Sequence, residues 1–250
     1  MAAPTGGPAL FGNFSRYYQF NPTAERLSLI PAAAITELLP PRGSREALAL
    51  DVGCNCGDLS LALYQHLDGS SGNLQPEVPR GLNLKLLGCD IDADLIRRAV
   101  ESNPFPESVS YVTLDIMDPA RREAVLEPYL GGFGRRSFDI CFCMSVTMWI
   151  HLHHGDQGLL DFLLLLARLS GVLLIEAQPW RCYRSAARRM RRLGRSDFDH
   201  FKRLSIRGDL AQRISHFLVT DCDMELLHCF GSTSWDRNLL LFRKLPPNQS

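Results

Sequence analysis

Short apolar runs alternate with segments of helical periodicity through the middle of the chain. The predicted strands are Ala47–Val52, Leu84–Asp90, Val109–Leu114, Phe138–Met144 and Gly171–Ala177. The predicted helices between them are Asp58–His66, Ala93–Glu101, Pro119–Leu130 and Asp156–Leu169. This alternation favours an α/β fold, with a mostly parallel sheet that is covered on both faces and joined by right-handed crossovers.

The part of the chain before the first strand follows another pattern. Residues 1–10 are small and rich in Pro and Gly, so we expect a flexible N-terminus there. Residues 11–20 are rich in aromatic side chains, and Ala24–Leu39 predicts a helix that is interrupted at Pro31. Residues 68–83 hold many Gly, Ser and Pro residues, which is typical of a surface insertion.

The pattern changes again after the fifth predicted strand. An arginine-rich helix comes first, and it is followed by a helix around Leu210–Thr220 and by a terminal antiparallel pair, Met224–Phe230 and Asn238–Phe242. The sequence shows no internal repeat and no linker that divides the chain. We therefore predict a single domain over residues 11–245, with a short tail at 246–250.

Composition agrees with a folded domain. Of the 250 residues, 46% are hydrophobic and 22% are charged, which supplies enough apolar surface for a core. No apolar run reaches the roughly 18 to 20 residues that a membrane span requires, and the start of the chain lacks the pattern of a signal peptide, so we expect no membrane partner. Eight cysteines, several of them inside predicted strands, suit free thiols in a reducing compartment. We expect a monomer in the cytoplasm, with room for a nuclear pool.

The net charge does not indicate a nucleic-acid partner, and the spacing of His and Cys residues does not indicate a metal site. The 27 basic residues balance the 27 acidic residues, so no global field attracts nucleic acid. The His153-His154 pair has no second cluster at ligand spacing, and the Cys-x-Cys pairs at 54–56 and 141–143 lack the spacing of a zinc site. We therefore expect no metal.

A glycine loop follows the first predicted strand, in the sequence DVGCNCGD from Asp51 to Asp58. Gly53 and Gly57 allow a tight strand-to-helix turn and a close approach of a ligand to the backbone. The dinucleotide pattern G-x-G-x-x-G is not present, because Asn55 stands at the middle glycine. Such a loop is weak evidence for a cofactor by itself, since many are only turns.

Acidic residues at the ends of the next strands strengthen this evidence. Asp90 ends the second strand, where a carboxylate can accept both ribose hydroxyls of a nucleoside. Asp115 follows the third strand beside Ile116, a pair suited to an adenine amino group and ring, and Met144 ends the fourth strand near the switch point of the sheet. Acids at strand ends are often solvated or cap helices. Their order after a glycine loop nevertheless resembles the seven-stranded Rossmann-like class I S-adenosylmethionine-dependent methyltransferases.

Two passages later in the chain are more distinctive. They are SVTMWIHL from Ser145 to Leu152 and LIEAQPW from Leu174 to Trp180. Together with GNF at 12–14 and the Tyr17-Tyr18 pair, they resemble the bicoid-interacting-protein family of RNA 5′-phosphate methyltransferases. The resemblance runs from about Phe11 to Phe242. It is closest to the branch that acts on microRNA precursors and histidine tRNA.

This resemblance implies S-adenosylmethionine as the cofactor and a small RNA with a 5′-monophosphate as the substrate. The implied cofactor contacts are Arg26, Asn55, Asp90, Asp115, Ile116 and Met144, to which the loop adds Asp51, Gly53 and Gly57. The implied acceptor site surrounds His151, Glu176, Gln178 and Trp180. Two residues depart from the family: Ala177 replaces a proline, and the arginine that triphosphate-capping relatives carry before Asn21-Pro22 is missing. The second departure favours a monophosphate end.

A phosphate acceptor makes modest chemical demands on the protein. With its second pKa near ~6, a phosphate monoester is largely a dianion at pH 7 and needs no general base. Catalysis then rests on positioning and on the exclusion of water. We expect His151 and Gln178 to hold the phosphate, with Tyr17 or Tyr18 closing the site. The alternative for each side chain is a satisfied structural role, which is the commoner fate of a lone His or Tyr.

The arginine-rich helix is the evidence for RNA that is independent of the resemblance. Guanidinium groups recur at three- and four-residue steps along one helical face, at Arg181, Arg184, Arg188, Arg192 and Arg195. The segment between Arg181 and Arg195 holds no Asp or Glu that could neutralise them. We therefore expect Arg181, Arg184, Arg188 and Arg192, with Trp180 as a stacking partner, to bind RNA. The alternative is a solvated face, and Trp180 as a single tryptophan is more often part of a core.

Two other functions stay open from the sequence. The first is a methyltransferase with a different acceptor, either an RNA base or a small molecule. The second is a module that binds RNA ends and has lost turnover, although the intact Asp90 and Asp115 argue against it.

Overall fold

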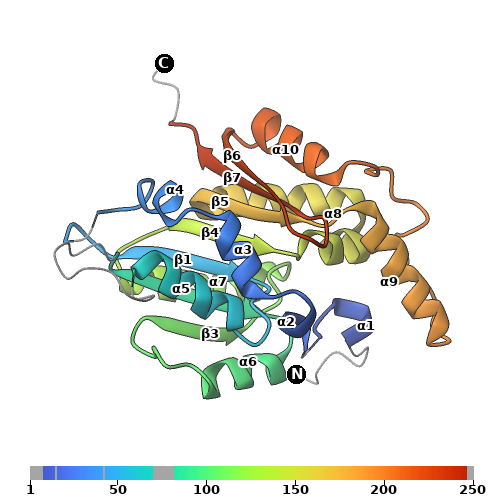
Figure 1. Ribbon diagram of the computed structural model, residues 1–250, viewed down its shortest axis with the longest axis horizontal. Helices are drawn as coiled ribbons and strands as arrows, with labels where there is room; N and C mark the ends of the chain where they lie inside the picture. Colours follow the sequence, from blue (N-terminus) through green and yellow to red (C-terminus); the bar gives the residue numbers. More distant parts are fainter. Residues whose placement is uncertain (1–7, 15, 42, 70–81, 247–250) are drawn as a thin grey trace. The chain divides into compact units, whose positions relative to one another are not determined.

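The computed structural model describes residues 8–14, 16–41, 43–69 and 82–246. Its strands are β1 (Ala47–Val52), β2 (Leu84–Asp90), β3 (Val109–Thr113), β4 (Phe138–Met144), β5 (Ser170–Ala177), β6 (Met224–Ser232) and β7 (Asn238–Lys244). They form one seven-stranded sheet in the order β3-β2-β1-β4-β5-β7-β6 (Figure 1). β1, β2 and β3 pair in parallel, whereas β7 pairs antiparallel with both β5 and β6. The predicted α/β class and the terminal antiparallel pair are confirmed.

Ten helices accompany these strands in the described part of the chain. They are α1 (Pro8–Phe11), α2 (Tyr17–Phe20), α3 (Thr23–Leu29), α4 (Ala32–Thr36), α5 (Asp58–Asp68), α6 (Ala93–Glu101), α7 (Pro119–Gly132), α8 (Thr147–Leu169), α9 (Trp180–Arg192) and α10 (Leu210–Asp221). Aspartates start three of them, because the carboxylates of Asp92, Asp118 and Asp209 accept hydrogen bonds from the first-turn amides of α6, α7 and α10. None of the described helices is long and apolar enough to cross a membrane.

The contacts within the chain divide it into two compact units. Unit 2 is Ser15–Phe142, and unit 1 combines Met1–Phe14 with Cys143–Ser250. In unit 2 every side chain of β1 is buried, and α5 and α6 pack against β2. In unit 1, α8 and α10 pack against β5, and α9 packs against α8 and α1. The predicted single domain over 11–245 stays a prediction.

Helix α8 begins nine residues earlier than predicted, at Thr147 instead of Asp156. Gly155, with φ 72° and ψ −172°, interrupts the helix and divides it into two parts. The first part carries Trp149 and three histidines between its apolar positions, so its polar spacing hides the helical periodicity. The kink therefore lies where the start was predicted.

The flexible N-terminus predicted for residues 1–10 stays a prediction. Pro8–Phe11 form the short helix α1, in which the carbonyl of Leu10 accepts a hydrogen bond from His153 Nε2 at 2.8 Å and the ring of Phe11 stacks on His153 at 4.7 Å. Residues 1–7 lie outside the described part of the chain, as do residues 70–81 of the predicted insertion and the end of the predicted tail. The helix predicted around Pro31 is indeed interrupted there, between α3 and α4.

Candidate functional site

The glycine loop after β1 has left-handed backbone at three positions. Gly53, Asn55 and Gly57 have φ values of 74°, 54° and 84°. Two amides at its start, of Gly53 and Cys54, donate to the carbonyl of Cys89 in β2 at 2.8 and 3.0 Å. Only glycine fits at position 57, since a Cβ there would lie 2.6 Å from the hydroxyl of Tyr111. The loop is thus a tight turn between β1 and α5 whose conformation is fixed by backbone hydrogen bonds and by Gly57.

Asp90 ties this loop to the end of β2. Its Oδ2 accepts the amide of Asn55 at 2.9 Å, and its Oδ1 accepts the amide of Asp92 at 3.0 Å. Burial raises the pKa of Asp90, while these amides oppose the increase. Each carboxylate oxygen has a further lone pair, so the group can still accept a pair of hydroxyl donors. This is the donor–acceptor match that a ribose requires.

The end of β3 adds the predicted adenine contacts. Asp115 Oδ1 accepts the amide of Met117 at 2.9 Å, which orients the carboxylate. Ile116 beside it is buried, and its carbonyl accepts a hydrogen bond from Arg122 at 2.8 Å. Because β1, β2 and β3 are parallel neighbours, their carboxyl ends lie at one edge of the sheet. The structure therefore brings the glycine loop, Asp90 and Asp115 to the same edge of unit 2.

Two predicted cofactor residues, Arg26 and Asp51, lie in the interior of unit 2. Arg26 is fully buried and donates to the carbonyl of Asn21 and to the hydroxyl of Tyr17, both at 3.0 Å. Asp51 is also buried and accepts the Ser60 hydroxyl at 2.5 Å. Burial raises the pKa of Asp51 to about 6, against the opposing effects of the Ser60 hydrogen bond and the Arg26 cation. The Asp51 carboxylate at the start of the glycine loop thus interacts with Ser60 and with the Arg26 cation inside unit 2. The predicted roles of Tyr17 and Arg26 toward ligands stay predictions.

Unit 1 contains a buried carboxylate network at the end of β5. Glu176 is fully buried, and its carboxylate accepts hydrogen bonds from the Ser145 hydroxyl and from Trp235 Nε1, the latter at 3.2 Å. Arg237 lies 3.9 Å from the same carboxylate and also donates to the Ser145 hydroxyl. Ser145, which follows Met144 at the end of β4, has a left-handed φ of 67°. Such backbone strain persists only where the surroundings enforce it.

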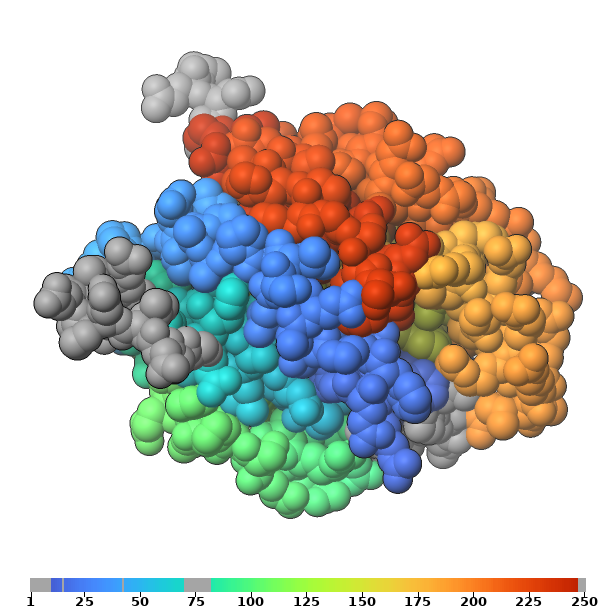
Figure 2. Space-filling view, in the orientation of Figure 1, coloured from blue at the N-terminus to red at the C-terminus, as the bar shows by residue number. Residues whose placement is uncertain are grey.

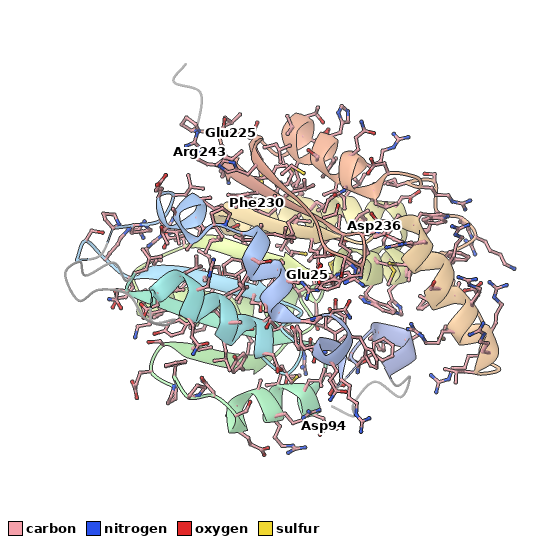
Figure 3. All side chains as sticks on the ribbon, viewed as in Figure 1. Glu25, Asp94, Glu225, Phe230, Asp236 and Arg243 are labelled. Carbon is pink, nitrogen blue, oxygen red and sulfur yellow. The ribbon has the colours of Figure 1, made fainter. Side chains whose placement is uncertain are left out.

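Trp235 and Arg237 were missed by the sequence analysis. They come from the turn between β6 and β7, where Asp236 is labelled in Figure 3. Arg237 is 92 residues from Ser145 in the sequence. The one available signal was the predicted antiparallel pair itself, whose connecting turn carries the sequence WDR.

Gln178 joins the end of β5 to the start of α8. Its Oε1 accepts the amide of Met148 at 3.0 Å and the hydroxyl of Thr147 at 3.4 Å, and its Nε2 donates to the carbonyl of Ser145 at 2.8 Å. The side chain is 2% exposed. Gln178 therefore holds the turn after Met144 in place, and its predicted contact with phosphate stays a prediction.

His151 is fully buried in α8. Its Nδ1 lies 3.1 Å from the Tyr183 hydroxyl, and its Nε2 lies 2.7 Å from Asp156 Oδ1. Burial lowers the pKa of His151, although Asp156 opposes this, so the neutral form is favoured. Burial alone would raise the pKa of Asp156, but hydrogen bonds from Ser205 and His151 hold it at about 2. Both ring nitrogens of His151 already have protein partners, and its predicted contact with an acceptor phosphate stays a prediction.

Trp180 lies in an aromatic cluster at the start of α9. Its ring stacks on Tyr183 and Phe201, with centroid distances of 4.9 and 5.7 Å, and the Arg207 guanidinium lies 5.2 Å from its centroid. The indole is only partly exposed. These contacts already occupy much of its surface, and its predicted stacking on an RNA base stays a prediction.

The arginine-rich helix is α9, and it has two different faces. Its buried face holds Tyr183, Ala186, Ala187 and Met190. Its opposite face exposes Arg184, Arg188 and Arg192, which we call the arginine row. No carboxylate of the described residues forms an ion pair with this row.

Arg181 corrects the expectation that no acid neutralises this face. Its guanidinium donates to the carbonyl of Trp235 at 2.5 Å and lies 3.4 Å from the Asp236 carboxylate. The partner comes from the β6–β7 turn and is invisible within α9 itself. Arg181 is thus engaged with the protein, and its predicted RNA contact stays a prediction.

Comparison with known proteins gives similarity over nearly the whole chain. The family described as Bicoid-interacting protein 3 (Bin3) matches residues 138–244. The Pre-miRNA 5′-monophosphate methyltransferase of Xenopus laevis is 53% identical over 242 residues, which cover 95% of this chain and 93% of that relative. The RNA 5′-monophosphate methyltransferase of Homo sapiens is 51% identical over 239 residues, which cover 95% of this chain and 81% of that relative.

A solved structure gives the fold. N-methyltransferase NodS from Bradyrhizobium japonicum WM9, in complex with S-adenosyl-L-homocysteine, superimposes with a TM-score of 0.50 at 15% identity. The match covers 92% of this chain and 89% of NodS. At this identity the likeness shows the fold alone, and it confirms the predicted Rossmann-like class.

Asp51→Asn is expected to remove a pH dependence of stability. The pKa of Asp51 is raised from 3.8 to about 6 in the folded protein, so between these pH values the native state keeps a proton that the unfolded state has released. The unfolding free energy of the unmutated protein therefore falls as pH rises through this range, by about 3 kcal/mol at ~1.4 kcal/mol per pKa unit. Urea unfolding at pH 4 and pH 6 measures it. An equal fall in Asp51→Asn would contradict the assignment.

Arg237→Ala is expected to destabilise unit 1 by about 3 kcal/mol, because it leaves the buried Glu176 carboxylate without its cation. Adding Glu176→Gln should restore part of this loss, since the uncompensated charge is then removed. Urea unfolding of the single and double variants measures both effects. Losses that simply add would show that the two side chains do not interact.

Proposed function

This chain belongs to the Bicoid-interacting protein 3 (Bin3) family, and we propose that it is an enzyme that transfers a methyl group from S-adenosylmethionine to the 5′-monophosphate of small RNAs. The observation that carries the proposal is the identity of more than half of the aligned residues, over 95% of this chain, to two enzymes named for that reaction. We include microRNA precursors and histidine tRNA among the substrates. We also propose a cytoplasmic monomer with a nuclear pool, supported by eight free thiols that suit a reducing compartment.

The residues at the sheet edge of unit 2 fit the cofactor. When bound, S-adenosylmethionine supplies an electrophilic methyl group on a sulfonium centre. The Asp90 carboxylate, oriented by two backbone amides, accepts the ribose hydroxyls. Asp115 accepts from the adenine amino group, and Ile116 offers the apolar surface beside it. Gly53 and Gly57 carry no Cβ, so the backbone of the loop can come close to a ligand.

The acceptor chemistry needs no base from the protein. An oxygen of the phosphate dianion forms the bond to the methyl carbon, while the carbon–sulfur bond breaks and its electron pair stays on sulfur. The sulfonium charge is cancelled and the RNA end loses one negative charge. The absence of a required proton transfer agrees with the neutral, doubly hydrogen-bonded state of His151. Unit 1 contributes rigidity, because Gln178 and the Glu176 network hold the turn after β4.

The loss of charge has a consequence for other proteins. Proteins that recognise a charged 5′-phosphate use arginine side chains or helix N-termini, and a methylated end offers them one negative charge fewer. The methylated RNA is therefore a poorer ligand for such proteins.

Asp90→Ala is expected to weaken binding of S-adenosylmethionine about 100-fold or more, because hydrogen bonds to a charged group contribute about 1.5 to 3 kcal/mol each and two are lost. Isothermal titration calorimetry measures the affinity. Asp94→Ala is the matched control, since Asp94 is an exposed aspartate on α6 (Figure 3). Unchanged cofactor affinity in Asp90→Ala would refute the assignment of the ribose contact.

The acceptor is tested with labelled S-adenosylmethionine and one hairpin RNA that carries a 5′-monophosphate, a 5′-triphosphate or a 5′-hydroxyl. We expect label in the monophosphate RNA alone, because the hydroxyl end has no phosphate to accept the methyl group, and because this chain lacks the arginine that triphosphate-capping relatives carry before Asn21-Pro22. Equal label in all three RNAs would show that a base or sugar is the acceptor. Cofactor binding without label in any RNA would indicate a module that binds RNA ends and has lost turnover.

A further inference from the structure

The segment between α9 and α10 is an ordered loop with two distinct sides. We call residues 198–207 the basic loop. Phe198 and Leu204 are buried in a cluster with Met148, Leu152 and Tyr183, and Phe201 and Ile206 pack against that cluster. The backbone folds into successive turns, in which the amides of Phe201, Arg203 and Leu204 donate to carbonyls three or four residues earlier. The apolar side chains thus anchor the loop to α8 and α9.

The charged side chains of the basic loop are turned the other way. Lys202, Arg203 and Arg207 are exposed. Among the described residues, no carboxylate forms an ion pair with any of the three. The neighbouring acids at 197 and 209 are engaged elsewhere, with Arg191 and with the first turn of α10. Asp199 is the exposed acid within the loop, so the loop's exposed side chains carry a net positive charge.

Asp156 fixes the shape of this loop. Its carboxylate accepts the amides of Ser205 and Ile206 at 2.8 and 3.1 Å, and it also accepts the Ser205 hydroxyl. His151 Nε2 lies 2.7 Å from the same carboxylate, and His151 Nδ1 contacts the Tyr183 hydroxyl of α9. A continuous chain of hydrogen bonds therefore links α9, α8 and the basic loop. Both contacts of the buried His151, with Tyr183 and with Asp156, belong to this structural chain.

The basic loop adjoins the start of α9. Phe201 stacks on Trp180, and the Arg207 guanidinium lies over the same indole at 5.2 Å. The arginine row begins one helical turn further along, at Arg184, and the helix itself lies at the surface of unit 1 (Figure 2). Two sets of three cations, none of which forms an ion pair with a described carboxylate, therefore belong to consecutive exposed elements.

We propose that the basic loop and the arginine row together bind the sugar–phosphate backbone of the RNA substrate beyond its methylated end, with Asp156 as the residue that positions the loop. The inference rests on the proposed function, which supplies the RNA. Lysine and arginine side chains that project from a rigid support contact phosphates without reading bases. The surface therefore selects RNAs by length and shape, and it does so independently of sequence.

The test compares two RNAs with the same 5′-monophosphate end, a hairpin and a short single strand that is too short to reach the basic loop. Lys202→Ala combined with Arg203→Ala removes two exposed charges without touching the core. We expect the hairpin KM to rise about 10-fold and the slope of log KM against log salt to flatten by about 1 to 2, since each lost phosphate contact removes about 0.7 to 0.9. The KM of the short RNA and the affinity for S-adenosylmethionine should not change.

The matched control is Arg121→Ala combined with Arg136→Ala, which removes two exposed arginines from unit 2. It should leave the hairpin KM and its salt slope unchanged. An unchanged salt slope in the loop variant would overturn the proposal, and so would an equal rise in KM for both RNAs. If the unmutated protein methylates neither RNA, the proposed function fails instead, and the salt slope of hairpin binding, measured by fluorescence anisotropy, still decides whether the loop binds RNA.

Asp156→Asn separates positioning from general stability. We expect it to raise the hairpin KM several-fold in the unmutated background and to have no further effect once Lys202 and Arg203 are alanines, because both changes act through one loop. Hydrogen exchange at the Ser205 and Ile206 amides should accelerate in Asp156→Asn. Equal fold-changes of KM in the two backgrounds would show that Asp156 acts elsewhere.

Discussion

Burial of carboxylates is the constraint on which both units depend. An ionised carboxylate taken out of water must receive hydrogen bonds or a cation, or it destabilises the fold by several kcal/mol. Asp90 receives two backbone amides, and Glu176 receives Ser145, Trp235 and Arg237. The left-handed residues Asn55 and Ser145 each take part in one of these two networks. The backbone that follows β1 and β4 is therefore held by hydrogen bonds to the buried carboxylates of Asp90 and Glu176.

The need to satisfy a partly buried carboxylate also determines how the elements of unit 1 are connected. Asp156 is satisfied by the loop that follows α9, and through His151 it also fixes α8 against α9. Buried polar groups thus hold the elements together, and the arginines and lysine on the opposite side of those elements are exposed. Residues with the appearance of catalytic groups, such as His151 and Gln178, serve first as supports, in agreement with a reaction that needs orientation and no proton transfer.

Much of the fold followed from local patterns. The strands β1, β2 and β4 have the predicted bounds, and the glycine loop, Asp90 and Asp115 lie where the order of motifs placed them. These features depend on residues close in sequence, whose apolar periodicity and backbone freedom are properties of the segment itself. The start of helix α8 was predicted wrongly, because the histidines of its first part mask an apolar face that packs against α9, the basic loop and the start of α10.

The sequence by itself determined the α/β class, the order of the strand-end acids and the charged face of α9, since each is a local pattern. The tertiary structure alone decided which polar side chains are partners. Arg237 lies 92 residues from Ser145, Trp235 lies 59 residues from Glu176, and Ser205 lies 49 residues from Asp156. A hydrogen bond depends on distance and direction in space, and no periodicity in the chain records which distant group satisfies a buried charge.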